Sequence, residues 1–244
     1  MISSFLSAMQ FLTVIPLKLK NISEKKIADA MIFFPVVGLI LGLFLSGLYK
    51  LLVIFNFPSF VSSVILVVAL IVITGGMHLD GLSDTADAFF SGKRKEKMLA
   101  IMRDPHAGVM GILSLICIIF IKVSLLLCIE APLIAASLIL MCVLSRWSAV
   151  LAIFLFPYAR RDGKAKVFFN GINSKIFLIS TSIVFICVFF TWQINAMGLL
   201  LTAAGVTYLT GKLSMRKING ITGDILGAII ELTEIAVLFI VLLI

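Results

Sequence analysis

Three aspartates, Asp80, Asp84 and Asp87, lie within eight residues of a chain whose neighbouring segments are almost entirely apolar. Their spacing is i, i+4 and i+7, which on a helix places all three carboxylates on one stripe. Three like charges on one helix face repel one another, and beside a bilayer little water screens them. The stripe therefore predicts a cation-binding site; the alternative is a solvated helix face outside the membrane.

Residues that could bind phosphate flank this stripe. Arginine can clamp a phosphate with two hydrogen bonds, and lysine adds a mobile point charge. The candidates for this role are His78, Lys93, Arg94, Arg103 and His106. Carboxylates that hold a divalent cation beside such groups describe a site for metal-assisted phosphoryl transfer.

A second acidic series lies near the C-terminal end of the sequence. Asp224, Glu231 and Glu234 are spaced i, i+7 and i+10, which is roughly one helical face. Glu234 would lie about 15 Å along the helix from Asp224, so we expect it to be protonated or paired with Arg146 or Lys122. Asp224 is a candidate substrate contact, and Glu231 is either a second such contact or a structural ion-pair partner.

The composition is that of a membrane protein. The chain has 244 residues, of which 61% are hydrophobic, and a mean hydropathy of +1.21. A bilayer is crossed by about 17 to 25 apolar residues in a helix, so we expect an all-α polytopic protein with about seven transmembrane helices. We place these helices at residues 31–53, 59–75, 108–129, 133–156, 176–192, 196–211 and 225–244. Residues 5–17 form a further apolar stretch, which we interpret as an interfacial or re-entrant segment ended by Pro16.

The positive charges alternate between loops. Lys and Arg in short loops stay on the cytoplasmic side, and 17 of the 20 basic residues lie in four alternate segments. These are Lys18, Lys20, Lys25 and Lys26; Lys93, Arg94, Lys95, Lys97 and Arg103; Arg160, Arg161, Lys164, Lys166 and Lys175; and Lys212, Arg216 and Lys217. We therefore expect a multi-pass protein of the cytoplasmic membrane with its acidic stripe on the cytoplasmic face. The net charge of +8 needs no nucleic acid, because topology and anionic membrane lipids explain it.

The chain has the organisation of a single domain spanning residues 1–244. No internal repeat or long linker divides it. The four cysteines, Cys117, Cys128, Cys142 and Cys187, all fall inside expected spans without paired spacing, so they are interpreted as small apolar residues. The sequence leaves open whether the protein forms a homo-oligomer.

Five segments of the chain, in order, resemble the cobalamin synthase family, the adenosylcobinamide-GDP ribazoletransferases of bacteria and archaea. The two most specific are residues 75–87 (GGMHLDGLSDTAD) and 101–111 (IMRDPHAGVMG). The others are residues 11–16 (FLTVIP), 34–38 (FPVVG) and 220–228 (GITGDILGA), the last followed by Glu231. The chain departs from the family at residues 88–90, where relatives usually have a glycine-containing stretch, and at residues 105–106, where relatives vary. Neither departure affects the acids.

The resemblance implies a membrane-bound final step of cobalamin biosynthesis. Members of the family transfer the phosphocobinamide part of adenosylcobinamide-GDP to α-ribazole or its 5′-phosphate and release GMP, with Mg²⁺ as cofactor. On this basis Asp80, Asp84 and Asp87 are expected to bind the metal. Asp84 or Asp104 is expected to act as the base for the ribazole hydroxyl, and Arg103, His106 and the basic loop are expected to bind the guanylyl phosphates.

Two other functions are compatible with parts of this pattern. A CDP-alcohol phosphotransferase also places spaced aspartates around a metal, but its Asp-Gly-x-x-Ala-Arg motif is not met, since Asp84-Thr85 stand where Ala-Arg would be. A transporter would explain acids and Arg146 within spans, but it predicts its densest acid cluster at mid-membrane rather than at a helix end. Binding of GMP with Mg²⁺ would distinguish the classes.

Overall fold

The computed structural model describes residues 1–17, 23–192 and 196–243, and throughout these ranges the regular structure is helical, which confirms the expected all-α fold. The elements run along the chain as α1 Ile2–Leu12, α2 Glu24–Ala28, η1 Asp29–Phe33, α3 Phe34–Ile54, α4 Ser59–Thr74, α5 Met77–Phe90, α6 Lys95–Ile101, α7 Val109–Cys128, α8 Ala131–Leu155, α9 Lys166–Gly171, α10 Ser174–Trp192, α11 Ala196–Ile218 and α12 Gly223–Val241.

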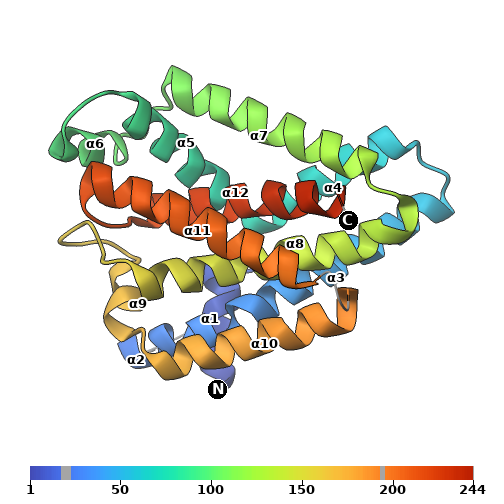
Figure 1. Cartoon of the computed structure of the whole chain (residues 1–244), viewed down its shortest axis with the longest axis horizontal. Helices are drawn as coiled ribbons and strands as arrows, with labels where there is room; N and C mark the ends of the chain where they lie inside the picture. Colours follow the sequence, from blue (N-terminus) through green and yellow to red (C-terminus); the bar gives the residue numbers. More distant parts are fainter. Residues whose placement is uncertain (18–22, 193–195, 244) are drawn as a thin grey trace.

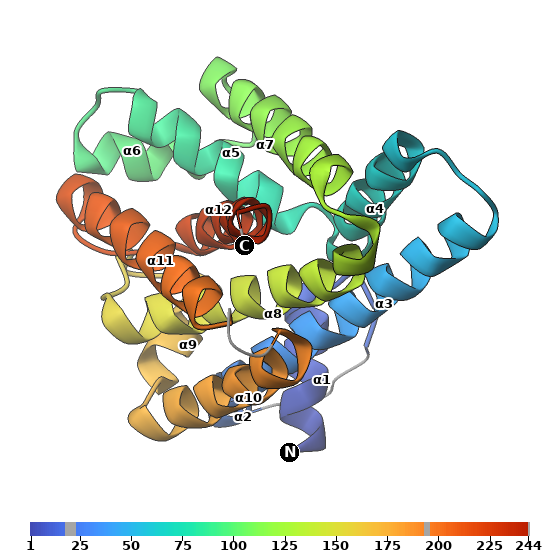
Figure 2. The same ribbon diagram turned by 45° about the vertical axis from the view of Figure 1, so that its right-hand side comes forward.

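Helix α8 is the centre of the molecule and packs against α3, α10, α11 and α12 (Figures 1 and 2). Its closest neighbour is α3, whose Gly38 and Gly42 face the α8 backbone: a Cβ atom on Gly42 would lie 2.5 Å from the Cα of Ile139. One turn further, the Ser46 hydroxyl donates to the carbonyl of Ala135 at 2.9 Å. Small residues at this spacing let two apolar helices approach closely where no water drives them together. The stripe Gly38, Gly42 and Ser46 therefore fixes α3 against the core helix.

Among the described residues, four helical segments are long and apolar enough to cross a membrane: Glu24–Ile54, Val109–Cys128, Ala131–Leu155 and Ser174–Thr191. A fifth candidate is the pair α4 and α5, which bends by 90° between the two helices. The predicted segments 196–211 and 225–244 lie largely in α11 and α12, but α12 carries three acidic residues and α11 ends in basic ones. The polytopic class is confirmed, whereas the count of seven spans is not, because length and apolarity support four or five.

The N-terminal apolar segment predicted at residues 5–17 forms α1 and an extended tail that contacts the end of α4. Ala8 and Leu12 are buried, while Met1 and Ile2 are exposed. After α1, the amide of Val14 donates to the carbonyl of Ile73 at the end of α4, at 2.9 Å. Figure 2 shows α1 running across the direction of α3 and α8. Whether α1 enters the bilayer stays a prediction.

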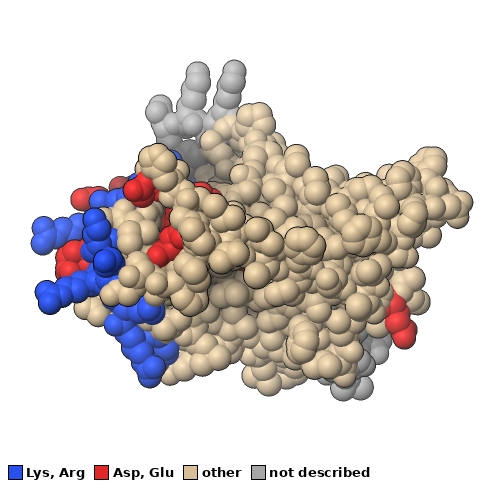
Figure 3. All heavy atoms as spheres, turned by 90° about the horizontal axis from the view of Figure 1, so that it is seen from above, with Lys and Arg blue, Asp and Glu red and all other residues tan. Residues whose placement is uncertain are grey.

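The charged residues gather at one end of the molecule (Figure 3). On the face shown, Lys and Arg lie at the left-hand end, where Figure 1 places α6, α9 and the turn between α11 and α12. The rest of that face is uncharged apart from an acidic side chain at the opposite end. The alternation of charged loops in the sequence is thus a real segregation in space. Of the basic residues in the predicted pattern, Lys18 and Lys20 lie outside the described residues.

Candidate active site

The acidic stripe lies on α5, a helix of 14 residues that begins directly after the sharp bend. Gly75 and Gly76, between α4 and α5, both have left-handed backbone angles, with φ values of 64° and 66°. Two consecutive residues of this kind end one helix and start another in a new direction, and only glycine adopts them without strain. A helix of 14 residues is about 21 Å long and is too short to cross a bilayer of about 30 Å. The bend therefore sets α5 apart from the apolar span before it.

Helix α5 crosses the start of α12 at backbone contact. A Cβ atom on Gly81 would lie 2.5 Å from the carbonyl oxygen of Asp224 and 3.0 Å from its Cα. On the other helix, a Cβ atom on Gly227 would lie 3.0 Å from the carbonyl oxygen of His78. The two glycines thus let the helices touch, which places Asp224 beside the acidic stripe. Asp224 was predicted as a functional residue, and its position against α5 is what the tertiary structure adds.

The acids at this crossing repel one another. Asp80 is exposed and Asp84 is partly buried, so both are open to solvent to some degree. Burial, together with the neighbouring carboxylates of Asp80, Asp224 and Asp87, raises the pKa of Asp84 to about 7, although Arg160 acts in the opposite direction. Both burial and neighbouring negative charges favour the protonated form of a carboxyl group. A bound cation would relieve the repulsion between these acids.

Asp87, the third acid of the stripe, caps the start of α7. One of its carboxylate oxygens accepts a hydrogen bond from the amide of Gly108 at 2.7 Å, and the other accepts one from the amide of Gly111 at 2.8 Å. The first amides of a helix have no partner within the helix, and a carboxylate satisfies both the amides and the helix dipole. A Cβ atom on either glycine would meet the Asp87 carboxylate, which would have to move. Asp87 therefore joins α5 to α7, with both of its oxygens already engaged.

The far end of α5 is held by a lysine. The ammonium group of Lys217, at the end of α11, donates to the carbonyl of Phe89 at 2.7 Å and lies 5.3 Å from the centroid of the Phe89 ring. A cation at the C-terminus of a helix satisfies an unpaired carbonyl and the negative end of the dipole. Lys217 thus fixes the direction of the helix that carries the acids.

An arginine from a separate loop completes the cluster. The loop after α8 pairs with the turn before α12, since the amide of Ala159 donates to the carbonyl of Ile221 at 2.9 Å and the amide of Ile221 donates to the carbonyl of Pro157 at 2.8 Å. These bonds place Arg160 next to Asp224, with its Nη2 atom 2.7 Å from the carboxylate. The sequence indicated Arg160 only as one member of a basic loop.

A basic cavity of about 920 Å³ opens beside this ion pair. Arg103, predicted as a phosphate contact, contributes to its wall together with Arg160. The remaining lining comes from α6 and the loop after α8, namely Lys95, Glu96, Leu99, Ala100, Tyr158, Ala159, Arg161 and Asp162. Ligand cavities in proteins are about 300 to 1,000 Å³, so the volume suits a nucleotide. Four cationic side chains, opposed by two acids, give the cavity the charge that a phosphate group requires.

Several predicted site residues lie away from this centre. Asp104 and His106 are both exposed in the loop after α6 and pair with each other, with His106 Nδ1 2.7 Å from Asp104 Oδ1. The hydrogen bonds from His106 lower the pKa of Asp104, which makes its carboxylate a weaker base. Lys93 and Arg94 are exposed in the loop after α5 and do not belong to the lining of the basic cavity.

His78 and Glu231 are buried behind the acids. Lys122 from α7 contacts Glu231 at 2.8 Å and Glu234 at 2.5 Å, and Arg146 from α8 pairs with Glu234. The expectation that Glu234 pairs with Arg146 or Lys122 is confirmed with both. Two acids and two cations balance in charge, which a low-dielectric interior demands. The structure therefore places Glu231 in a structural network, and neither it nor His78 lies on the open face with Asp80.

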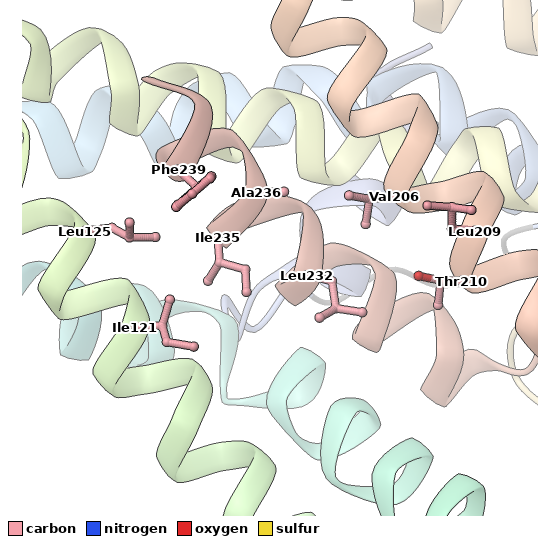
Figure 4. Close-up of a pocket in the computed structure, with 9 residues that line it drawn as sticks. All are labelled: Ile121, Leu125, Val206, Leu209, Thr210, Leu232, Ile235, Ala236 and Phe239. Atoms are coloured by element: carbon pink, nitrogen blue, oxygen red, sulfur yellow. The ribbon is translucent and has the colours of Figure 1, made fainter. Parts of the chain in front are cut away.

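A second cavity, of about 400 Å³, lies between α7, α11 and α12 (Figure 4). It is lined by Ile121, Leu125, Val206, Leu209, Thr210, Leu232, Ile235, Ala236 and Phe239. Only the hydroxyl of Thr210 is polar, so this apolar space offers no group for charge transfer or phosphate binding.

The donors at the α5–α12 crossing suit Mg²⁺. Carboxylate oxygens are its preferred protein ligands, and Asp80, Asp84 and Asp224 lie near one another with Arg160 as the cation that pairs with them. Within the described ranges, no three acidic, histidine or cysteine side chains already converge on one point. Mg²⁺ tolerates this, because it usually keeps several waters and takes one or two carboxylates from the protein.

Comparison with known proteins points to a single family. The family model described as cobalamin-5-phosphate synthase matches residues 4–242. Curated relatives named adenosylcobinamide-GDP ribazoletransferase include that of Acetivibrio thermocellus, 39% identical over 92% of this chain and 91% of the relative. Those of Thermodesulfovibrio yellowstonii and Desulforamulus reducens are 39% and 31% identical, each over 100% of this chain and 97% of the relative. No solved structure matches the chain at a significant level.

Proposed function

The chain belongs to the cobalamin-5-phosphate synthase family, and we propose that the acids at the α5–α12 crossing and the adjoining basic cavity carry out its transfer reaction. The activity is that of an adenosylcobinamide-GDP ribazoletransferase, a final step of cobalamin biosynthesis. It joins the phosphocobinamide part of adenosylcobinamide-GDP to α-ribazole or its 5′-phosphate and releases GMP. The observation that carries the proposed site is the convergence of Asp80, Asp84 and Asp224 beside Arg160 and the basic cavity.

Asp80 and Asp84 are the carboxylates that would hold Mg²⁺. Asp87, also predicted as a ligand, has both oxygens in hydrogen bonds to α7, so its main contribution is to fix α5. When bound, Mg²⁺ would neutralise the negative charge that develops on the phosphate oxygens during transfer.

Asp84 is the better of the two predicted bases for the ribazole hydroxyl. A general base must lie where the substrate hydroxyl can reach it. Asp84 lies on the acidic stripe of α5, whereas Asp104 lies in the exposed loop after α6 and pairs with His106. We therefore assign the acceptance of the hydroxyl proton to Asp84.

The basic cavity would bind the guanylyl phosphates. Arg103 and Lys95 line it on the side of α6, and Arg160 and Arg161 line it on the side of the loop after α8. Cations around the leaving phosphate stabilise the charge that it gains when the phosphoanhydride bond breaks. The acids would thus hold the metal at the phosphate that is transferred, and the cations of the cavity would bind the phosphate that leaves with GMP.

The test is release of GMP by the purified protein. Wild type should release GMP from adenosylcobinamide-GDP only when α-ribazole and Mg²⁺ are both present, and EDTA should stop the reaction. Asp80→Asn should lower the rate at least 100-fold, because the variant loses a carboxylate that holds Mg²⁺ and the charge that develops on the phosphate oxygens is then not neutralised. Glu130→Gln, an exposed acid in the loop between α7 and α8, is the matched control and should retain wild-type activity. Full Mg²⁺-dependent release by Asp80→Asn would contradict the site.

We further propose that the site faces the cytoplasm from the cytoplasmic membrane. The support is the alternation of basic loops and their gathering at the end of the molecule that carries α6 and the basic cavity. In a variant without the four native cysteines, a cysteine introduced at position 94 should react with a membrane-impermeant reagent only from the cytoplasmic side. Labelling from outside intact cells would reverse the topology.

A further inference from the structure

Arg160 lies in the wall between the acids and the basic cavity. It lines the cavity of about 920 Å³, and its Nη2 atom bonds to the Asp224 carboxylate at 2.7 Å. Its side chain is only 11% exposed. The other cavity cations, Lys95, Arg103 and Arg161, have no ion-pair partner within the described parts of the chain. Arg160 is thus the cation that the acids and the cavity share.

The hydrogen-bonding capacity of Arg160 is only partly used. A guanidinium group has five N–H donors. Nη2 donates to Asp224 and, at 3.5 Å, to the carbonyl of Met102. Its Nε atom is buried and has no partner among the described residues. A buried donor without a partner costs free energy, so Arg160 is able to gain hydrogen bonds from a further acceptor.

The charges at the crossing indicate when Arg160 could exchange the Asp224 carboxylate for another acceptor. Asp80, Asp84 and Asp224 carry three negative charges when ionised, and Arg160 supplies one positive charge, which leaves two in excess. A divalent cation would balance the excess. The cation would also repel Arg160 and so offset part of the attraction that holds the guanidinium group at Asp224.

We propose that Arg160 moves from Asp224 to the phosphate of the guanosine nucleotide when a divalent cation occupies the acids, so that metal and nucleotide strengthen each other's binding. This inference rests on the proposed function, since it takes the basic cavity as the nucleotide site. Arginine suits the exchange because its planar donors match carboxylate and phosphate oxygens equally well. A largely buried cation is also less screened by salt than the exposed ones around it.

The experiment measures binding of GMP to the purified full-length protein by calorimetry, with and without Mg²⁺. In wild type, Mg²⁺ should tighten GMP binding. Arg160→Gln should weaken GMP binding at least tenfold with Mg²⁺ present, the loss expected for hydrogen bonds to a charged group, and should abolish the effect of Mg²⁺. If Mg²⁺ acted only by binding to GMP itself, its effect on GMP binding would persist in Arg160→Gln. Lys164→Gln removes an exposed charge from the same loop and should bind GMP as wild type does.

Asp224→Asn separates exchange from a purely structural ion pair. Freed from its carboxylate, Arg160 should bind GMP several-fold more tightly without metal than it does in wild type. A structural ion pair would give the opposite result, since loss of either partner would then weaken binding or leave it unchanged. Arg160→Lys keeps the charge without the planar donors and should lie between wild type and Arg160→Gln, which covers the case in which Arg160→Gln does not fold.

The inference fails if Arg160→Gln, or Arg160→Lys where the former does not fold, binds GMP within twofold of wild type. It also fails if Asp224→Asn does not tighten metal-free binding. These outcomes differ from a failure of the proposed function, in which wild type itself would release no GMP from adenosylcobinamide-GDP.

Discussion

A methyl group on Gly81 would force α5 away from α12. Its Cβ atom would lie 2.5 Å from the carbonyl oxygen of Asp224, whereas ordinary contact begins at 3.4 Å. The backbone must therefore give way by about 0.9 Å, because the atom it meets is main chain and has no rotamer to change. We expect Gly81→Ala to cost about 1 to 3 kcal/mol of stability, as overpacking usually does.

The effect of Gly81→Ala on catalysis should exceed its effect on folding. A displacement of about 1 Å between catalytic groups can lower a rate about 100-fold, and Asp224 would be separated from the stripe by nearly that distance. The assay is Mg²⁺-dependent release of GMP at a temperature well below the midpoint of thermal unfolding, which is measured on the same sample.

The matched control is Gly205→Ala in α11, where the added Cβ would point into open space. Alanine in a helix interior should leave activity unchanged and raise stability by about 0.5 to 1 kcal/mol. If Gly81→Ala retained activity within threefold of wild type, the close crossing of α5 and α12 would not be what assembles the site.

Three further variants probe the charges around the crossing. Asp84→Asn should raise the unfolding midpoint of the metal-free protein by about 2 to 4 °C, the shift for about 1 kcal/mol, and should also lower GMP release at least 100-fold. In wild type, the pKa of Asp84 is raised from 3.8 to about 7. Between pH 4 and pH 7, Asp84 therefore keeps its proton in the folded protein and loses it in the unfolded chain. Metal-free stability should thus fall as the pH rises from 4 to 7, and Mg²⁺ should stabilise more at pH 8 than at pH 6. Lys122→Met should destabilise the protein by about 3 to 5 kcal/mol by leaving buried acids uncompensated, and Glu231→Gln added to it should restore part of that loss. Asp87→Asn should speed hydrogen exchange at residues 108–111, since the helix cap is weakened, while Mg²⁺ affinity stays within threefold of wild type.

Each of these variants has an outcome that would count against its premise. Unchanged metal-free stability in Asp84→Asn, or a pH profile that this variant shares with wild type, would mean that burial and the neighbouring acids do not destabilise the ionised form of Asp84. Strict additivity of Lys122→Met and Glu231→Gln would show that the two side chains are not coupled. A large loss of Mg²⁺ affinity in Asp87→Asn would return this residue to the metal ligands.

The common helix face of the three acids and the ion pairing of Glu234 were predictable from sequence, because each depends on local chemistry. The spacing of Asp80, Asp84 and Asp87 places them on one helix face whatever surrounds the helix. Glu234 required a buried partner because an isolated charge is not tolerated among apolar side chains, and Lys122 and Arg146 supply it.

The hydrogen bonds that distinguish Asp87 from the other two acids could not be predicted. Nothing in the spacing separates Asp87 from the other two acids, but the start of α7 happens to lie against it and takes both of its oxygens. Arg160 was equally hidden, since a basic loop is explained by topology alone. A possible signal was the nearby glycine-rich turn at residues 219–223, whose pairing with residues 157–159 fixes this arginine.

By itself, the sequence determined the all-α membrane class, the polar end of the molecule and the acidic stripe, because composition, charge alternation and helical period act within single segments. Tertiary structure alone decided that α4 and α5 meet at 90°, that Gly81 and Gly227 bring Asp224 to the stripe, and that Arg160 stands between acids and cavity. These are contacts between segments far apart in the chain. They depend on which backbones can approach within van der Waals distance, and no local pattern encodes that.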